Sequence, residues 1–197
     1  MRNGRILLMA IEIEMKVRVA SHEPVRERLR ALGGEFVALM LETNCIFDRP
    51  DRSLRRAGCG LRVRSSKVLE GMGGGVKITF KGPARSGLFK TREEVEVKVD
   101  DADAAAAVLE RLGFTRILKY EKRRERWRLE ECIVELDEPA RLGVFVEIEG
   151  PNDDAIRDVQ RKLGLEELKH IGKSYVEMAI KYCEEHGISD FRLTIVD

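Results

Sequence analysis

The sequence predicts an α+β fold in which eight mostly antiparallel strands close into a β-barrel and helices pack outside it. Two observations support this prediction. Charged and apolar residues alternate in several segments, as in residues 12–17, and this spacing places them on opposite faces of a strand. The order of one strand, one helix and three strands also occurs twice along the chain, which gives eight strands in all.

The repeat rests on matching segments in the two halves. Glu12-Ile13-Glu14-Met15-Lys16-Val17 is similar to Glu94-Val95-Glu96-Val97-Lys98-Val99, and a predicted helix follows each of them. The first helix ends Leu29-Arg30-Ala31-Leu32-Gly33, and the second ends Leu109-Glu110-Arg111-Leu112-Gly113. We interpret the match as duplication of a β-α-β-β-β unit. Chance similarity between two short alternating strands is the alternative.

In the first half, Ser21 is expected to cap a helix that has Pro24 in its first turn and ends before Gly33. The Gly71–Gly75 segment lacks the lysine and hydroxyl of a phosphate-binding P-loop, so we interpret it as a hairpin tip. Residues 49–58 are expected to be irregular or a short helix. The predicted strands of this half are residues 6–19, 35–48, 59–67 and 77–81.

In the second half, Asp101 or Asp103 is expected to cap an alanine-rich helix that runs to Leu112 and ends at Gly113. Two more helices are predicted at about residues 153–163 and 173–186, and a short strand within the tail from Ser189 to Asp197. The predicted strands of this half are residues 88–99, 114–128, 131–138 and 143–149.

Length and composition indicate one globular domain. The 197 residues suffice for a single core, placed at about residues 9–182, with 183–197 as a C-terminal extension. The net charge of +1 does not indicate a strongly basic nucleic-acid-binding protein, and no apolar run approaches the roughly 20 residues of a membrane span. Four widely spaced cysteines are typical of reduced thiols in a cytoplasmic protein. Met9 is an alternative natural start that the sequence leaves open.

The charged face of the predicted strands carries both signs. An ordinary barrel would turn the opposite, apolar face inward, but the predicted helices allow the reverse, with the charged residues lining a wet interior. A solvated sheet face, with surface ion pairs worth about 0–1 kcal/mol each, is the alternative. Members of this face are Glu12, Glu14, Lys16, Arg62, Arg64, Lys77, Lys81, Arg92, Glu94, Glu96, Lys122, Arg124, Asp137, Glu147 and Glu149.

The residue types on this face indicate which ligands could bind there. Carboxylates from the first and last strands suit hard divalent cations such as Mg²⁺ or Mn²⁺. Arginines and lysines at alternate positions suit phosphate oxygens, and an arginine can bind two of them at once. A polyanion with bound metal ions would therefore complete the charge balance of such an interior.

The segments that carry these residues also form a series of motifs in order along the chain. They are Glu12-x-Glu14-x-Lys16, Leu61-Arg62-Val63-Arg64, Thr79-Phe80-Lys81-Gly82-Pro83, Arg92-Glu93-Glu94-Val95-Glu96, Lys122-Arg123-Arg124, Leu136-Asp137, Leu142-Gly143-Val144-Phe145-Val146-Glu147-Ile148-Glu149 and Ser174-Tyr175. The series resembles the CYTH superfamily, the triphosphate tunnel metalloenzymes. The resemblance covers residues 10–180 and implies an eight-stranded antiparallel barrel around a charged tunnel that binds a triphosphate with Mg²⁺ or Mn²⁺.

By this resemblance, acidic residues hold metal, basic residues cradle phosphates, and Glu94 and Glu96 support them. The expected metal ligands are Glu12, Glu14, Asp137, Glu147 and Glu149. The expected phosphate ligands are Lys16, Arg62, Arg64, Lys81, Arg92, Lys122 and Arg124. Lys16 and a metal-bound water are the candidates for the catalytic base. Lys122 is preferred to Lys119 because it shares a face with Arg124. Lys77 is either a ligand or a peripheral charge.

The function expected from the resemblance is that of a class IV adenylyl cyclase, which converts ATP to cyclic AMP and pyrophosphate. Some cyclases of that branch carry a His-Phe element where this chain has Ile6-Leu7-Leu8, which favours considering a triphosphatase as well. The triphosphatase substrates would be thiamine triphosphate, tripolyphosphate or another organic triphosphate. A third hypothesis is a non-catalytic module that binds a nucleotide or polyphosphate. The complete set of acidic residues argues against it, because binding a polyanion alone would need only the basic residues. The expected partner is a small triphosphate, without nucleic acid or membrane, and a homodimer is left open.

Overall fold

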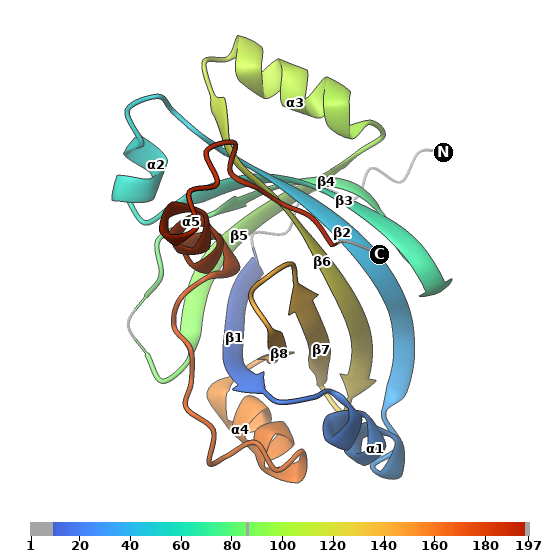
Figure 1. The fold of residues 1–197 in the computed structure, drawn as a ribbon. Helices are drawn as coiled ribbons and strands as arrows, with labels where there is room; N and C mark the ends of the chain where they lie inside the picture. The colour runs from blue at the N-terminus through green and yellow to red at the C-terminus, as the bar shows by residue number, and fades with distance from the viewer. Residues whose placement is uncertain (1–9, 86, 196–197) are drawn as a thin grey trace.

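The structure is a computed structural model, and it describes residues 10–85 and 87–195. Eight strands form a closed antiparallel ring in the order β2-β3-β4-β5-β1-β8-β7-β6, and β6 pairs back to β2 (Figure 1). The predicted barrel is thus confirmed. The strands of the ring are β1 (Ala10–Val19), β2 (Glu35–Asp48), β3 (Gly60–Gly71), β4 (Gly75–Lys81), β5 (Lys90–Val99), β6 (Thr115–Leu129), β7 (Cys132–Pro139) and β8 (Val144–Glu149).

The prediction for β3 differs most from the structure in length. β3 continues to Gly71, beyond the expected end at residue 67, because its pairing with β2 extends to the hairpin tip. The part of the first predicted strand that covers residues 6–9, together with the alternative start at Met9, lies outside the described residues. The tail forms β9 (Arg192–Leu193), which pairs in parallel with β6 where β7 no longer covers that edge.

Helices cover two opposite sides of the barrel (Figure 1). α1 (Glu23–Ala31) and α4 (Asp153–Lys162) lie on one side, and α3 (Ala102–Arg111) lies on the other. α2 (Ser53–Arg56) is a single turn between β2 and β3, and α5 (Tyr175–Glu185) follows a long connection from α4. This arrangement leaves the interior of the barrel to side chains from the strands and from α5.

The start of α1 corrects one expectation. The N-cap is His22, not Ser21, and the Ser21 hydroxyl instead accepts a hydrogen bond from the Glu23 amide at 3.1 Å. His22 is buried, with its Nε2 atom 2.8 Å from the carbonyl oxygen of Phe145 in β8. This contact anchors His22 to the barrel wall, and the helix begins after it.

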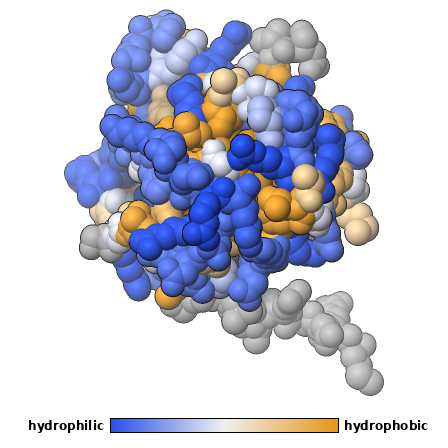
Figure 2. Space-filling view, turned by 90° about the horizontal axis from the view of Figure 1, so that it is seen from below, coloured by the Kyte–Doolittle hydropathy of each residue, from blue (hydrophilic) through white to orange (hydrophobic). Residues whose placement is uncertain are grey.

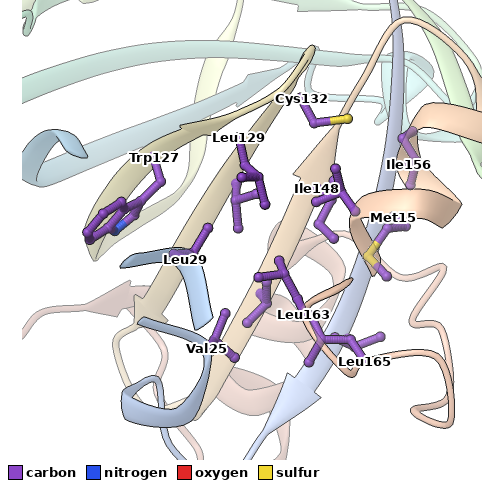
Figure 3. Packing of buried hydrophobic residues seen from close by; sticks show 14 of the residues in the cluster. Met15, Val25, Leu29, Trp127, Leu129, Cys132, Ile148, Ile156, Leu163 and Leu165 are labelled. Carbon is purple, nitrogen blue, oxygen red and sulfur yellow. The ribbon is translucent and has the colours of Figure 1, made fainter. Parts of the chain in front are cut away.

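The largest apolar cluster lies outside the barrel wall, between β1, β6, β7, β8 and the helices α1 and α4 (Figure 3). Met15 and Ile148 face outward from the wall, and Leu29 and Ile156 come from the two helices. These side chains are almost fully buried. The alternation of Glu14, Met15 and Lys16 therefore turns the apolar residue out toward the helices and the charged residues in, the reverse of an ordinary barrel.

A second outer cluster lies under α3, where Ala105, Ala106 and Leu109 pack against Phe47 and Val63. The outer wall is not covered everywhere, since Ile11 and Val97 keep 60% and 42% of their surface exposed. Seen from the side of α1 and α4, the surface is hydrophilic over most of its area, with hydrophobic residues between charged ones (Figure 2). Among the described residues, no helix is long and apolar enough to span a membrane.

One end of the barrel interior is filled by α5. Tyr175, Ala179 and Ile180 of this helix are buried against Ile46 of β2 and Tyr120 of β6. Ile46 and Tyr120 continue the inward-facing series of their strands, so the helix packs into the barrel rather than on its outer wall. The charged part of the interior therefore adjoins an apolar end.

The outer packing makes a testable prediction. Replacing Ile148 by alanine should lower the free energy of unfolding by about 2–5 kcal/mol, because a fully buried side chain would leave a cavity between β8 and α4. Urea denaturation followed by circular dichroism measures the change. Ile11→Ala on the exposed part of the wall is the control, and it should change the value by no more than about 0.5 kcal/mol. Equal losses in the two variants would contradict the inside-out arrangement.

Candidate functional site

The barrel encloses a cavity of about 720 Å³, which we call the barrel cavity. Charged side chains from β1 and from β3 to β8 line most of it, and residues of α5 close one end. The charged lining consists of Glu12, Glu14, Lys16, Arg62, Arg64, Lys77, Lys81, Lys90, Arg92, Glu94, Glu96, Lys122, Arg124, Arg126, Glu135, Glu147 and Glu149, with Asp48, Arg55 and Glu177 at the end near α5.

The structure brings together all the site residues predicted from the sequence. Every one of them lines the barrel cavity except Asp137, which is fully buried behind Lys122 and Arg124. Lys122 lines the cavity, whereas Lys119 pairs with Arg192 of β9 and does not. Lys77, for which the sequence left a ligand or a peripheral charge as alternatives, lies in the cavity wall.

Several polar residues of the interior were not among the predicted site residues. Lys90, Arg126 and Glu135 line the cavity, and Glu42 and Asn44 of β2 are buried in the wall behind it. The signal for Lys90, Arg126 and Glu135 was present, because each continues an alternating series by two residues beyond a residue that was named. Glu42 and Asn44 had no such series, since Met40 before them and Ile46 after them are apolar.

Arg124 is the centre of the most buried part of the interior. Its Nε donates to Asp137 Oδ1 at 2.7 Å, and its Nη2 lies 2.6 Å from Asp137 Oδ2 and 2.7 Å from Glu147 Oε2. A third carboxylate, Glu135, pairs with Nη1 of the same guanidinium. Burial alone would lower the pKa of Arg124, but these carboxylates outweigh it and hold that pKa well above its ordinary value.

Lys16 extends this network from β1. Its Nζ lies 3.0 Å from Glu147 Oε1 and donates to the carbonyl oxygen of Lys173 at 3.3 Å. The same Nζ lies 3.8 Å from the ring centroid of Tyr175, which places a cation over an aromatic face. Burial would lower the pKa of Lys16, but Glu147 and Glu14 raise it above its ordinary value, so the amine stays protonated.

Glu42 occupies a similar position between cations of two neighbouring strands. Its Oε1 accepts a hydrogen bond from Arg64 Nη1 at 3.1 Å, and its Oε2 lies 3.5 Å from Lys122 Nζ. Its side chain is only 2% exposed. Burial would raise the pKa of Glu42, but the charges of Arg64 and Lys122 outweigh burial and hold the pKa far below its usual range.

The other side of the cavity carries simpler pairs. Lys81 Nζ lies 2.6 Å from Glu12 Oε2 and 2.9 Å from Glu94 Oε2. Lys90 Nζ lies 2.9 Å from Glu14 Oε1. Lys77 also pairs, with Glu96 on the next strand. These side chains are more exposed than those around Arg124, so their pairs are easier to open.

Some charged residues of the cavity lining have no ion-pair partner in the described part of the chain. Arg62 and Arg92 form no ion pair there, and the Nε atom of each is buried without a hydrogen-bond partner. Arg62 makes one long contact, from Nη2 to the Thr79 hydroxyl at 3.5 Å. Glu149 likewise forms no ion pair with residues 10–85 or 87–195. The cavity thus presents unpaired cations and an unpaired carboxylate in one space.

Burial and neighbouring carboxylates explain the protonation of Glu149. Its direct partner across the two strands is Glu14, whose carboxylate is paired with Lys90 at 2.9 Å. Glu149 lies at the exposed rim, yet partial burial of its carboxylate, followed by the charges of Glu135 and Glu12, raises its pKa to about 7. A bound cation would relieve this repulsion.

Comparison with known proteins gives an independent result. The model of the CYTH domain family matches residues 10–175. The chain is 29% identical over 177 residues to a Methanocaldococcus jannaschii protein named "Putative adenylate cyclase", a match that covers 85% of this chain and 98% of that protein. It is also 29% identical over 178 residues to adenylate cyclase CyaB of Aeromonas hydrophila, covering 83% of this chain and 86% of that one.

The fold has solved counterparts. The structure of the PH1819 protein from Pyrococcus horikoshii OT3 superimposes with a TM-score of 0.74 and is 28% identical, covering 87% of this chain and 99% of that chain. The PH1012 protein from the same organism gives a TM-score of 0.70 at 29% identity, covering 84% and 98% of the two chains.

The buried pairs of Glu42 make a prediction about stability. Replacing Glu42 by glutamine should lower the free energy of unfolding at pH 7 by about 3–5 kcal/mol, because Arg64 and Lys122 would stay buried without their carboxylate. Glu23→Gln removes an exposed carboxylate that pairs with Arg26 and serves as the control, with a change of at most about 0.5 kcal/mol.

The same variant predicts a pH dependence. Because the pKa of Glu42 is lower in the folded state, its stabilising effect is complete above the ordinary value of 4.5 and declines as the pH falls below it. The difference between wild type and Glu42→Gln should therefore be largest near pH 7 and smaller at pH 3, in urea titrations at both pH values. A difference that widens at low pH would contradict the assignment.

Proposed function

The chain belongs to the CYTH domain family, and from that premise we propose that it is a divalent-metal-dependent enzyme that converts ATP to cyclic AMP and pyrophosphate. The observation that carries the proposal is the coexistence of unpaired charges of both signs in the barrel cavity. Arg62 and Arg92 are cations without carboxylate partners in the described chain, and Glu149 is a carboxylate without a cation. A complex of a polyphosphate with a divalent metal ion supplies the missing partner to each.

The acidic residues differ in how well they suit the metal. The side-chain oxygens of Glu135, Asp137 and Glu147 lie within 4.8 Å of one another, but they already accept hydrogen bonds or ion pairs from Arg124 and Lys122. Glu149 suits a cation better, because it has no ion-pair partner among the described residues and Glu14 lies directly opposite it on β1. We therefore assign Glu14 and Glu149, with Glu12, as the principal ligands, and Asp137 and Glu147 as residues that act mainly through Arg124 and Lys16.

The basic residues also differ in whether a carboxylate of the barrel already holds them. Arg62 and Arg92 are free to bind oxygens directly, and Lys81 becomes available when metal competes for Glu12. Arg64, Lys122 and Arg124 are already held by acids of the wall. In this proposal Lys122 and Arg124 give the cavity a fixed positive region, Arg62 and Arg92 bind the substrate, and Arg64, held only at Nε and Nη1, keeps Nη2 for a phosphate oxygen. When bound, Mg²⁺ or Mn²⁺ would neutralise charge on phosphate oxygens.

Lys16 is proposed to act as a cation rather than as a base. Its raised pKa keeps the amine protonated near neutral pH, so it can donate to a phosphate oxygen on which negative charge develops. In the cyclase reaction the ribose 3′-hydroxyl attacks the α-phosphorus and loses its proton to water. The bond from the α-phosphorus to the oxygen bridging to the β-phosphorus breaks, and pyrophosphate leaves with the electron pair. Hydrolysis of a terminal phosphate would use the same lining, with water as the nucleophile.

Product analysis distinguishes these reactions. The purified protein is incubated with Mg²⁺ or Mn²⁺ and, separately, with ATP, thiamine triphosphate and tripolyphosphate, and the products are identified by chromatography. We expect cyclic AMP and pyrophosphate from ATP, and no reaction after the metal is removed with a chelator. Inorganic phosphate as the product would instead assign a triphosphatase. Binding without any product would favour a non-catalytic module.

The proposed metal ligands make a second prediction. Glu12→Gln and Glu14→Gln should each lower turnover by about a hundredfold or more, because the metal loses a ligand on β1. Both variants should still bind tripolyphosphate in metal-free buffer at least as tightly as wild type, since Lys81 or Lys90 is released from its acid. Glu110→Gln on the exposed α3 is the control and should leave turnover unchanged. Full activity in both β1 variants would contradict the assignment.

A further inference from the structure

Two polar residues of β2 are buried in the barrel wall but do not line the barrel cavity. Glu42 is 1% exposed and Asn44 is 0% exposed, and neither is among the cavity-lining residues. Their neighbours on the same face, Met40 and Ile46, are apolar. A buried carboxylate and a buried amide cost stability unless they serve specific partners, so their contacts identify what they do.

Both residues bind the same guanidinium. Asn44 is the direct partner of Arg64 across β2 and β3, and its Oδ1 accepts a hydrogen bond from Arg64 Nε at 3.0 Å. Glu42 Oε1 accepts from Arg64 Nη1 at 3.1 Å. Arg64 itself lines the barrel cavity. Its third nitrogen, Nη2, makes no hydrogen bond with the described residues and is not among the buried unpaired atoms, so it remains available on the cavity side.

The other oxygen of Glu42 reaches a second cation. Glu42 pairs in register with Lys122 of β6, and its Oε2 lies 3.5 Å from Lys122 Nζ without a hydrogen bond. Lys122 is also held by Asp137 at 3.0 Å. Glu42 therefore lies between the cations of the two strands that flank β2.

Arg64 differs in this respect from Arg62 and Arg92, two other arginines of the cavity lining. Arg62, two residues away on β3, has only a 3.5 Å contact with Thr79, and Arg92 has no side-chain hydrogen bond with the described residues. A guanidinium whose Nε and Nη1 are already held loses less side-chain freedom when it binds an anion than a free one does. Arg64 is therefore fixed in position, whereas the side chains of Arg62 and Arg92 can adjust to a ligand.

We propose that Asn44 and Glu42 are positioning residues that hold Arg64 with Nη2 directed to the barrel cavity, where it binds a phosphate of the substrate. The inference rests on the proposed function insofar as the ligand is a polyphosphate. It extends that function to two residues of β2 that act through Arg64 and do not touch the substrate. Asn44 is the cleaner residue to test, because replacing Glu42 also changes the charge of the interior.

The test is a double-mutant cycle on Asn44 and Arg64. Asn44→Leu removes the acceptor, and Arg64→Lys keeps the positive charge but has no Nε for Asn44 to hold. The probe is inorganic tripolyphosphate in metal-free buffer, with affinity measured by isothermal titration calorimetry. Asn44→Leu should weaken binding roughly tenfold in the wild-type background, the effect of one hydrogen bond to a charged group, and should have almost no effect in the Arg64→Lys background.

Controls separate positioning from folding. Thr43→Val replaces a polar residue at the next position of β2, on the opposite face of the strand, and should leave affinity unchanged. Thermal unfolding of each variant reports whether it is folded, and Asn44→Ala replaces Asn44→Leu if the larger side chain prevents folding. Unchanged affinity in the Asn44 variants, or an equal loss in both Arg64 backgrounds, would overturn the proposal.

The outcome also separates this inference from the proposed function. If the protein binds tripolyphosphate and shows the expected coupling between Asn44 and Arg64, yet turns over no triphosphate, the positioning proposal stands and the proposed enzymatic function is wrong. If the protein turns over a triphosphate but shows no coupling between Asn44 and Arg64, the proposed function stands and the positioning proposal is wrong. Absence of tripolyphosphate binding to the folded wild type would overturn the positioning proposal directly.

Discussion

Compensation of charge inside a closed barrel is the constraint on which the rest of this structure depends. A buried ion without a partner costs several kcal/mol, so a barrel with a charged interior folds only if its strands supply both signs at matching positions. The contacts of Arg124 show how this is done, since Asp137 and Glu135 reach it from β7 and Glu147 reaches it from β8. At Arg62, Arg92 and Glu149 the match is incomplete among the described residues, and in our proposal these charges bind the substrate and its metal ion.

The inside-out arrangement of the barrel follows from the same constraint. Because the interior is polar, the apolar face of each strand must be buried on the outside, and α1, α4 and α3 provide the cover. α5 has a different task, since its buried residues pack into one end of the interior and bring the Tyr175 ring over Lys16. The helices thus define both the wall and the end of the cavity.

Much of this could be predicted from the sequence because strand alternation has a strict period of two. Once Glu12-x-Glu14-x-Lys16 and Glu147-x-Glu149 are placed on strands, the shared face follows, and the structure puts these residues in one cavity. The pairing of charges could not be predicted, because it depends on register between strands far apart in sequence. Only the closed sheet shows that Glu14 lies opposite Glu149. The same holds for Arg124, which pairs with carboxylates from β7 and β8. Asn44 was missed because an isolated amide among apolar residues has no pattern, and the helix cap was misplaced because burial of His22 depends on Phe145.

The central claim is that the unpaired charges of the cavity are completed by a metal-bound polyphosphate, and a crystal structure of the protein with Mn²⁺ and tripolyphosphate tests it most directly. The account predicts anomalous scattering from manganese beside Glu14 and Glu149 and phosphate oxygens on Arg62 and Arg92, with the Arg124 contacts unchanged. Manganese within the Glu135, Asp137 and Glu147 cluster, or tripolyphosphate bound outside the barrel, would contradict it.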